Sequence, residues 1–155
     1  MSDPDKSFEI YNQICESFKE FCDKHGSISE TDTRIKFIDR ILKEVLNWVE
    51  PNISREDHTN GINVGYSDYQ LSLKNKPYII IEAKREGISF VLPESSGRRR
   101  LKISGILQTS PEAISAINQV RQYCVDDAII HYAIATNGYS WIIFKTTQGV
   151  EGSWK

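Results

Sequence analysis

Two amphipathic helices are predicted in the first third of the chain. Between residues 5 and 25 apolar side chains recur at helical spacing, and Gly26 follows as a stop. A second helix is predicted from Ser29, which can cap it, to about Trp48, with acidic residues in its first turn, where they suit the helix dipole. Its buried stripe is expected to comprise Ile35, Ile38, Leu42, Val45 and Leu46.

A β-hairpin is predicted in the middle of the chain. Residues 51 to 61 are polar and rich in turn formers, so a loop is expected there. The runs 63 to 73 and 78 to 85 favour two strands joined at residues 74 to 77. Because the second run is apolar on both faces, we expect it to be a central strand.

The second half of the chain predicts a loop, a helix and another hairpin. Periodicity is lost from residue 86 to 109, which indicates a long loop. A cap, a proline and an acid open a helix over residues 110 to 123. The last two strands, residues 129 to 136 and 139 to 146, meet at Asn137-Gly138, which strongly favours a turn. The expected fold is α/β, a mixed β-sheet flanked by α-helices.

Composition limits the possibilities without choosing a function. The chain has 155 residues, 39% hydrophobic and 26% charged, which suits one domain. It has no apolar run near the roughly 20 residues of a membrane-spanning helix and an acidic start, so we expect no membrane association and a cytoplasmic location. Of three cysteines, Cys15 and Cys22 fit the first helix as small buried groups, so neither a disulfide framework nor a zinc site is expected. The net charge of −2 means that a polyanion would have to be bound by local patches.

Glu82 and Lys84 are charged residues in the predicted central strand. They are two apart, so their side chains leave the same face, where burial is costly unless the charges pair or bind a metal. If the hairpin turn has an odd number of residues, for instance 74 to 76, Asp68 lies directly opposite Glu82. Converging carboxylates repel unless a divalent cation lies between them, and oxygen ligands suit Mg²⁺ or Mn²⁺. Lys84 would then align or activate a water.

Ordinary structural explanations compete with this one. Glu82 and Lys84 could form a solvated ion pair on an edge strand, and Asp68 could be a turn or strand-surface acid. The isoleucines before Glu82 favour a central strand instead. The pairing with Glu82 in turn favours a functional role for Asp68.

The sequence resembles a known nuclease superfamily at these residues. Asp68, thirteen intervening residues and then Glu82-Ala83-Lys84 on consecutive strands resemble the PD-(D/E)XK signature, with Ser67 where the name has proline, a variable position. Over about residues 28 to 146 the chain is similar to the nuclease domain at the N-terminus of type I restriction enzyme R subunits. Five segments in the same order carry the resemblance: Glu30-Thr31-Asp32-Thr33-Arg34, Tyr66-Ser67-Asp68-Tyr69-Gln70-Leu71, Ile81-Glu82-Ala83-Lys84-Arg85, Gln119-Val120-Arg121-Gln122-Tyr123 and Ala135-Thr136-Asn137-Gly138.

The resemblance implies a restriction-endonuclease-like fold and a metal-dependent reaction. A DNA phosphodiester would be hydrolysed by water activated at Mg²⁺ or Mn²⁺. Asp68, Glu82 and the backbone carbonyl of Ala83 would hold the metal. Lys84 would position the attacking water, and Glu30 would assist at the metal site.

Two further groups of residues are expected to support substrate binding. Gln119 and Tyr123 lie on one helical face, and the resemblance implies that they contact DNA or brace the catalytic strands. They could instead be a polar helix edge that packs on the sheet, but the resemblance favours the supporting role. Arg98, Arg99 and Arg100 would supply phosphate contacts near the site, although such a run is usually a solvated loop.

Other polar residues have ordinary explanations. Glu30 could simply suit the helix dipole, with Arg34 one turn later as its partner. His58 and His131 are isolated and are not expected to be ligands.

The sequence analysis therefore predicts a magnesium-dependent DNA endonuclease of restriction or anti-phage defence. The chain is expected to be a single nuclease domain, the N-terminal part of a larger protein with a fused or associated motor, NTPase or sensor module. The alternative is a catalytically silent nucleic-acid-binding or assembly module with the same fold. Homo-oligomerisation through the helix of residues 8 to 22 is compatible with either, and the signature does not separate DNA from RNA substrates.

Overall fold

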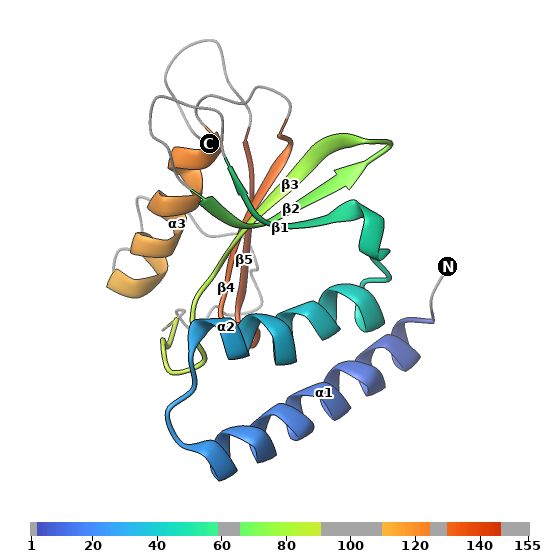
Figure 1. Cartoon of the computed structure of the whole chain (residues 1–155), viewed down its shortest axis with the longest axis vertical. Coiled ribbons are helices and arrows are strands. Elements are labelled where there is room, and N and C mark those ends of the chain that lie inside the picture. The colour runs from blue at the N-terminus through green and yellow to red at the C-terminus, as the bar shows by residue number, and fades with distance from the viewer. Residues whose placement is uncertain (1–2, 59–65, 91–109, 125–129, 147–155) are drawn as a thin grey trace, which may run out of the picture.

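A five-stranded mixed sheet with helices against both faces forms the protein (Figure 1). The computed structural model describes residues 3–58, 66–90, 110–124 and 130–146. The strands are β1 Ile53–His58, β2 Tyr66–Leu73, β3 Lys76–Ala83, β4 Tyr132–Thr136 and β5 Trp141–Lys145. They lie in the order β1-β2-β3-β4-β5, with β3 and β4 parallel and the other neighbours antiparallel. The predicted α/β class and the central position of β3 are confirmed.

The first helix, α1 Pro4–His25, forms as its sequence predicts. Asp3 caps it by accepting a hydrogen bond from the Asp5 amide at 3.1 Å, and Pro4 occupies the first turn, where a missing N–H is harmless. Gly26 ends the helix with φ 71°, a conformation that favours glycine. The inner face of α1 packs Ile14 and Phe18 against the second helical segment.

The second helical segment departs from regular α geometry. It comprises α2 Glu30–Thr33, the π-helical stretches η1 Arg34–Ile38 and η2 Ile41–Val45, and the short 3₁₀ turn η3 Glu50–Asn52. Ser29 caps α2 as predicted, by accepting a hydrogen bond from the Asp32 amide at 3.0 Å. The regular segment ends at Val45, slightly before the predicted Trp48.

Two residues of the predicted buried stripe are exposed instead. Ile35 is 58% exposed and Leu46 51% exposed, whereas Phe37 and Ile41 take buried places. The prediction assumed the period of an α-helix. π turns hold more residues per turn, so different positions of the sequence face the core. Ile38 and Leu42 are fully buried as predicted.

The predicted loop at residues 51 to 61 was wrong, because β1 occupies part of it. β1 is an edge strand that pairs antiparallel with β2, with Ile53 opposite Leu71. Its remaining residues, Ser-Arg-Glu-Asp-His, are polar and show no apolar alternation, so the strand carries no sequence signal of its own. β1 therefore forms because it pairs with β2. Residues 59–65 lie outside the described part of the chain.

The remaining elements agree with the prediction where they are described. α3 Pro111–Cys124 connects β3 to the parallel β4 and covers one face of the sheet through Ile117 and Val120. The chain turns between β4 and β5 where predicted, but the connection comprises residues 137–140 and not Asn137-Gly138 alone, because Thr136 pairs with Trp141. The predicted loop is free of helix and strand over residues 86–90, and residues 91–109 lie outside the described part. Among the described helices, none is long and apolar enough to cross a membrane.

Candidate active site

The β2–β3 hairpin brings Asp68 and Glu82 together by a route that differs from the one expected. The turn has two residues, Lys74 and Asn75, with φ 52° and 61°, rather than an odd number. A register shift between Leu71 and Ser72 then leaves one extra residue, Tyr78, on β3. The bulge restores the register in which Tyr69 pairs with Ile81, so Asp68 comes next opposite Glu82.

Glu82 and Lys84 lie on the face of β3 that α3 covers. Glu82 is 2% exposed, and its Oε1 accepts a hydrogen bond from Lys84 Nζ at 2.6 Å. Lys84 also donates to Gln119 Oε1 at 2.8 Å, and Gln119 Nε2 donates to the Tyr123 hydroxyl at 3.1 Å. The resulting chain of contacts joins the central strand to α3.

The second oxygen of Glu82 is the most unusual atom of this cluster. Glu82 Oε2 is buried and has no hydrogen-bond partner among the described residues. A buried carboxylate oxygen without a donor is costly, and such atoms in folded proteins usually mark a missing water, ion or ligand. Glu82 therefore has one oxygen bonded to Lys84 and one with no hydrogen-bond donor among the described residues.

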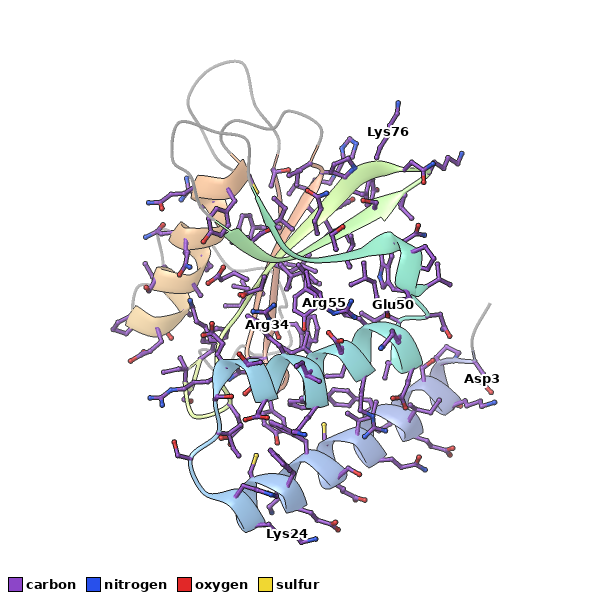
Figure 2. All side chains as sticks on the ribbon, in the orientation of Figure 1. Asp3, Lys24, Arg34, Glu50, Arg55 and Lys76 are labelled. Atoms are coloured by element: carbon purple, nitrogen blue, oxygen red, sulfur yellow. The ribbon has the colours of Figure 1, made fainter. Side chains whose placement is uncertain are left out.

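Asp68 is held by two donors from different layers. The Ala83 amide donates to Asp68 Oδ2 at 2.7 Å, and Arg34 Nη1 lies 3.1 Å from Asp68 Oδ1. The Arg34 guanidinium also lies over the Tyr69 ring, 5.5 Å from its centroid. Figure 2 shows Arg34 between the helical layer and the sheet.

Sequence reasoning missed this role of Arg34. It considered Arg34 only as a partner for Glu30, whereas in the structure the guanidinium reaches Asp68. The signal was present in the Glu-Thr-Asp-Thr-Arg segment at the helix start, but its target lies on another strand.

Burial raises the pKa of both carboxyl groups. Burial raises the pKa of Glu82 from 4.5 to about 7, with repulsion by Asp68 and Glu30 adding to it and the Lys84 hydrogen bond opposing it. Burial also raises the pKa of Asp68, opposed by the Ala83 amide and the Arg34 charge. A cation at this point would therefore relieve a real electrostatic cost.

Glu30 faces the same cluster from the start of α2. Its charge contributes to the raised pKa values of Asp68 and Glu82, although its own side chain is exposed. Thr33 Oγ1 accepts a hydrogen bond from the Glu86 amide at 3.1 Å, which ties this helix start to the segment after β3. The position of Glu30 is compatible with the predicted assisting role at the metal site and with an ordinary interaction with the helix dipole.

The donor set suits a hard divalent cation. Within the part of the chain that the structure describes, no group of three or more His, Cys, Asp or Glu side chains could hold a metal ion. Asp68 and Glu82 supply two such side chains, and a Mg²⁺ site commonly takes one or two carboxylates and completes its shell with waters. The unpartnered Glu82 Oε2 fits this chemistry, and the Ala83 carbonyl lies on the same strand.

Arg98, Arg99 and Arg100 lie outside the described residues, so their predicted phosphate contacts stay predictions. The ring of His131 packs on that of Tyr78, with the two ring centroids 4.9 Å apart.

Comparison of the chain with protein-family models, with curated proteins and with solved structures gave no match. The function must therefore be inferred from the residues of the site. These are two facing carboxylates, a lysine held beside them and an arginine from the helical layer.

Proposed function

We propose that this chain is a divalent-metal-dependent endonuclease domain of the PD-(D/E)XK type, with a restriction-endonuclease-like fold, that hydrolyses DNA phosphodiester bonds. The observation that carries the proposal is the buried Glu82 Oε2 near Asp68, which has no hydrogen-bond partner in the part of the chain that the structure describes, with Lys84 Nζ 2.6 Å from the other Glu82 oxygen. The mixed sheet with helices against both faces is compatible with this fold. The resemblance of five ordered sequence segments points the same way.

The chemistry follows from the residues present. Bound by Asp68, Glu82 and the Ala83 carbonyl, Mg²⁺ or Mn²⁺ would supply an acidic water and neutralise charge on the phosphate. An ammonium group has three N–H donors, and Lys84 directs two of them at Glu82 and Gln119. The third is left to orient the attacking water, and Lys84 is 20% exposed, so a water can reach it.

Gln119 and Tyr123 act in this proposal as braces. Gln119 accepts from Lys84 and donates to Tyr123, so both ends of its amide are used within the chain. This favours orientation of the lysine over direct contact with DNA. Holding a catalytic group within a few tenths of an ångström is what such supporting hydrogen bonds contribute.

The biological setting rests on the resemblance alone. We propose that the domain cuts DNA without sequence choice of its own, in restriction or anti-phage defence in the cytoplasm. A fused or associated motor, NTPase or sensor module would decide when it cuts. Arg98, Arg99 and Arg100 would add phosphate contacts.

A second candidate is a catalytically silent nucleic-acid-binding or assembly module. One observation favours it: each carboxylate already has a cation of the chain beside it, Arg34 at Asp68 and Lys84 at Glu82. Such pairs neutralise charge without a metal. The unpartnered Glu82 Oε2 is left unexplained by this candidate.

Plasmid cleavage with Mg²⁺ or Mn²⁺ tests the proposal. Glu82→Ala and Lys84→Ala are expected to lower the cleavage rate by about 10³-fold, because each removes a group that stabilises or positions the reacting atoms. Glu9→Ala and Lys19→Ala, exposed positions on α1, are matched controls expected to cut like the wild type. Calorimetry should show Mn²⁺ binding kept in Lys84→Ala and lost in Glu82→Ala.

The metal titration separates the two candidates if no cutting is seen. A folded wild type that binds Mn²⁺ at Glu82 but does not cut would indicate a nuclease that needs its activating module. A folded wild type that neither cuts nor binds Mn²⁺ would rule out the nuclease and leave the silent module.

A further inference from the structure

Arg34 pairs with the Asp68 oxygen that does not accept from the Ala83 amide. The Ala83 amide donates to Asp68 Oδ2 at 2.7 Å, which makes Oδ1 the more open oxygen for a metal, and Arg34 Nη1 lies 3.1 Å from Oδ1. Both side chains are largely buried, at 12% exposure for Arg34 and 13% for Asp68. The contact is therefore a desolvated ion pair at the centre of the candidate site.

The backbone of Arg34 is fixed while its side chain extends from it. Its amide donates to the carbonyls of Glu30 and Thr31, and its carbonyl accepts from the Asp39 amide across the π turn. The Tyr69 hydroxyl lies 3.2 Å from the same carbonyl. π turns within helices occur frequently at functional sites. The backbone at Arg34 is thus rigid, and its guanidinium can change partners by rotations of the side chain alone.

A guanidinium and a divalent cation repel each other when both lie against one carboxylate oxygen. Like charges at such distances repel strongly in a partly buried site. The planar guanidinium fork matches phosphate oxygens as well as it matches a carboxylate. A displaced Arg34 would thus find an equivalent partner in the substrate that the proposed function brings to the site.

We propose that Arg34 exchanges partners: it neutralises Asp68 Oδ1 in the metal-free chain and moves to a phosphate oxygen of the nucleic acid when a divalent cation takes that oxygen. This inference rests on the proposed nuclease function. It makes Arg34 a competitor of the metal and a contact of the substrate. A residue that merely supports the fold would not have opposite effects on the two ligands.

The first measurement is calorimetric titration of Mn²⁺ alone into wild type and Arg34→Gln. Loss of the competing charge should tighten Mn²⁺ binding by about tenfold or more. Arg40→Gln is the matched control, because Arg40 lies on the same helical segment but pairs with the exposed Glu44 at 2.7 Å. It should bind Mn²⁺ like the wild type. Arg34→Lys keeps the charge and should also stay close to the wild type.

The second measurement is binding of a short DNA duplex at saturating Mn²⁺, with Lys84→Ala added to every protein so that the duplex stays intact. Arg34→Gln should bind the duplex more weakly. Its plot of log affinity against log salt should be shallower by about 0.9, the loss of one phosphate contact. Arg40→Gln should leave both quantities unchanged.

Opposite signs for the two ligands would establish the exchange. Unchanged Mn²⁺ affinity in Arg34→Gln, with the wild type binding Mn²⁺, would overturn this inference and leave the nuclease proposal standing. Tighter Mn²⁺ binding with unchanged duplex binding would overturn the phosphate contact. No Mn²⁺ binding by either folded protein would overturn the proposed function and this inference with it.

Discussion

Glu82 is a carboxylate at the centre of a sheet, and its environment disfavours the charged form. Only 2% of the residue is exposed, and Asp68 and Glu30 repel its charge. Lys84 offsets part of this cost through one oxygen. A carboxyl group that is buried and repelled in this way has a pKa above its ordinary value, and shifted pKa values are typical of functional sites.

The raised pKa of Glu82 predicts that metal-free stability falls between about pH 4.5 and 7. In this window the folded protein keeps the Glu82 proton while the unfolded chain releases it, so rising pH favours unfolding. The free energy of unfolding should fall by on the order of 3 kcal/mol over the window and then level off. Urea unfolding at a series of pH values measures it.

Glu82→Gln is the control for this prediction, because the amide does not titrate. The variant should show a much flatter profile over the same window. A profile as steep as that of the wild type would mean that other groups, not Glu82, carry the dependence.

The hairpins show how local elements set the positions of site residues. The β2–β3 turn adopts positive φ at Lys74 and Asn75, and a bulge at Tyr78 then corrects the register. The β4–β5 turn uses Asn137, whose Oδ1 accepts from the amides of Tyr139 and Ser140. β4 in turn supports the end of β3, since the Lys84 amide donates to the Thr136 carbonyl at 2.8 Å.

Gly138 should be intolerant of any side chain. It has φ 90°, and a Cβ there would lie 2.3 Å from Phe37 Cδ1. Gly138→Ala should lower the free energy of unfolding by about 2 to 4 kcal/mol, from backbone strain and overpacking together. Chemical unfolding of the purified variant measures this loss.

Gly87→Ala is the matched control for the same measurement. A Cβ at Gly87 would meet nothing within 4 Å, so stability should change little. Equal losses in the two variants would contradict a specific steric role for Gly138.

At the scale of the whole molecule, a buried polar network fastens the helical layer to the sheet. Asp39, on the helical segment, is 7% exposed and accepts from Arg55 of β1 at 2.8 Å and from the Tyr69 hydroxyl of β2 at 2.8 Å. Arg55 also donates to Glu50 at 2.6 Å, and Figure 2 shows this pair beside the sheet. The network adjoins the candidate site, because Arg34 lies over the Tyr69 ring and Asp68 precedes Tyr69 on β2.

Arg55→Met should be strongly destabilising because it leaves Asp39 as a buried charge without its cation. We expect a loss of about 3 to 5 kcal/mol in urea unfolding. The double variant Asp39→Asn with Arg55→Met removes both charges and should recover part of the loss. Arg40→Met, which breaks an exposed pair with Glu44, should cost about 1 kcal/mol or less.

Much of the fold was present in the sequence because it follows from local rules. Helical periodicity and a terminal glycine predicted α1, a cap, a proline and an acid predicted α3, and β-forming runs with turn formers predicted β3 and the last hairpin. The facing of Asp68 and Glu82 was also predicted, although by an odd-numbered turn rather than by a two-residue turn and a bulge. Residues two apart on a strand share a face whatever the rest of the chain does, so Glu82 and Lys84 could be placed on one face from sequence alone.

What the sequence did not determine depends on partners distant along the chain. β1 has no apolar pattern and exists because β2 offers it an edge, and Ile35 and Leu46 are exposed because π turns rotate the helical segment against the sheet. Arg34 found Asp68, 34 positions away, only once that packing was set. Local propensity fixes which residues repeat on a face, but tertiary packing chooses which face is buried and which charges meet there, since burial energy is shared among segments.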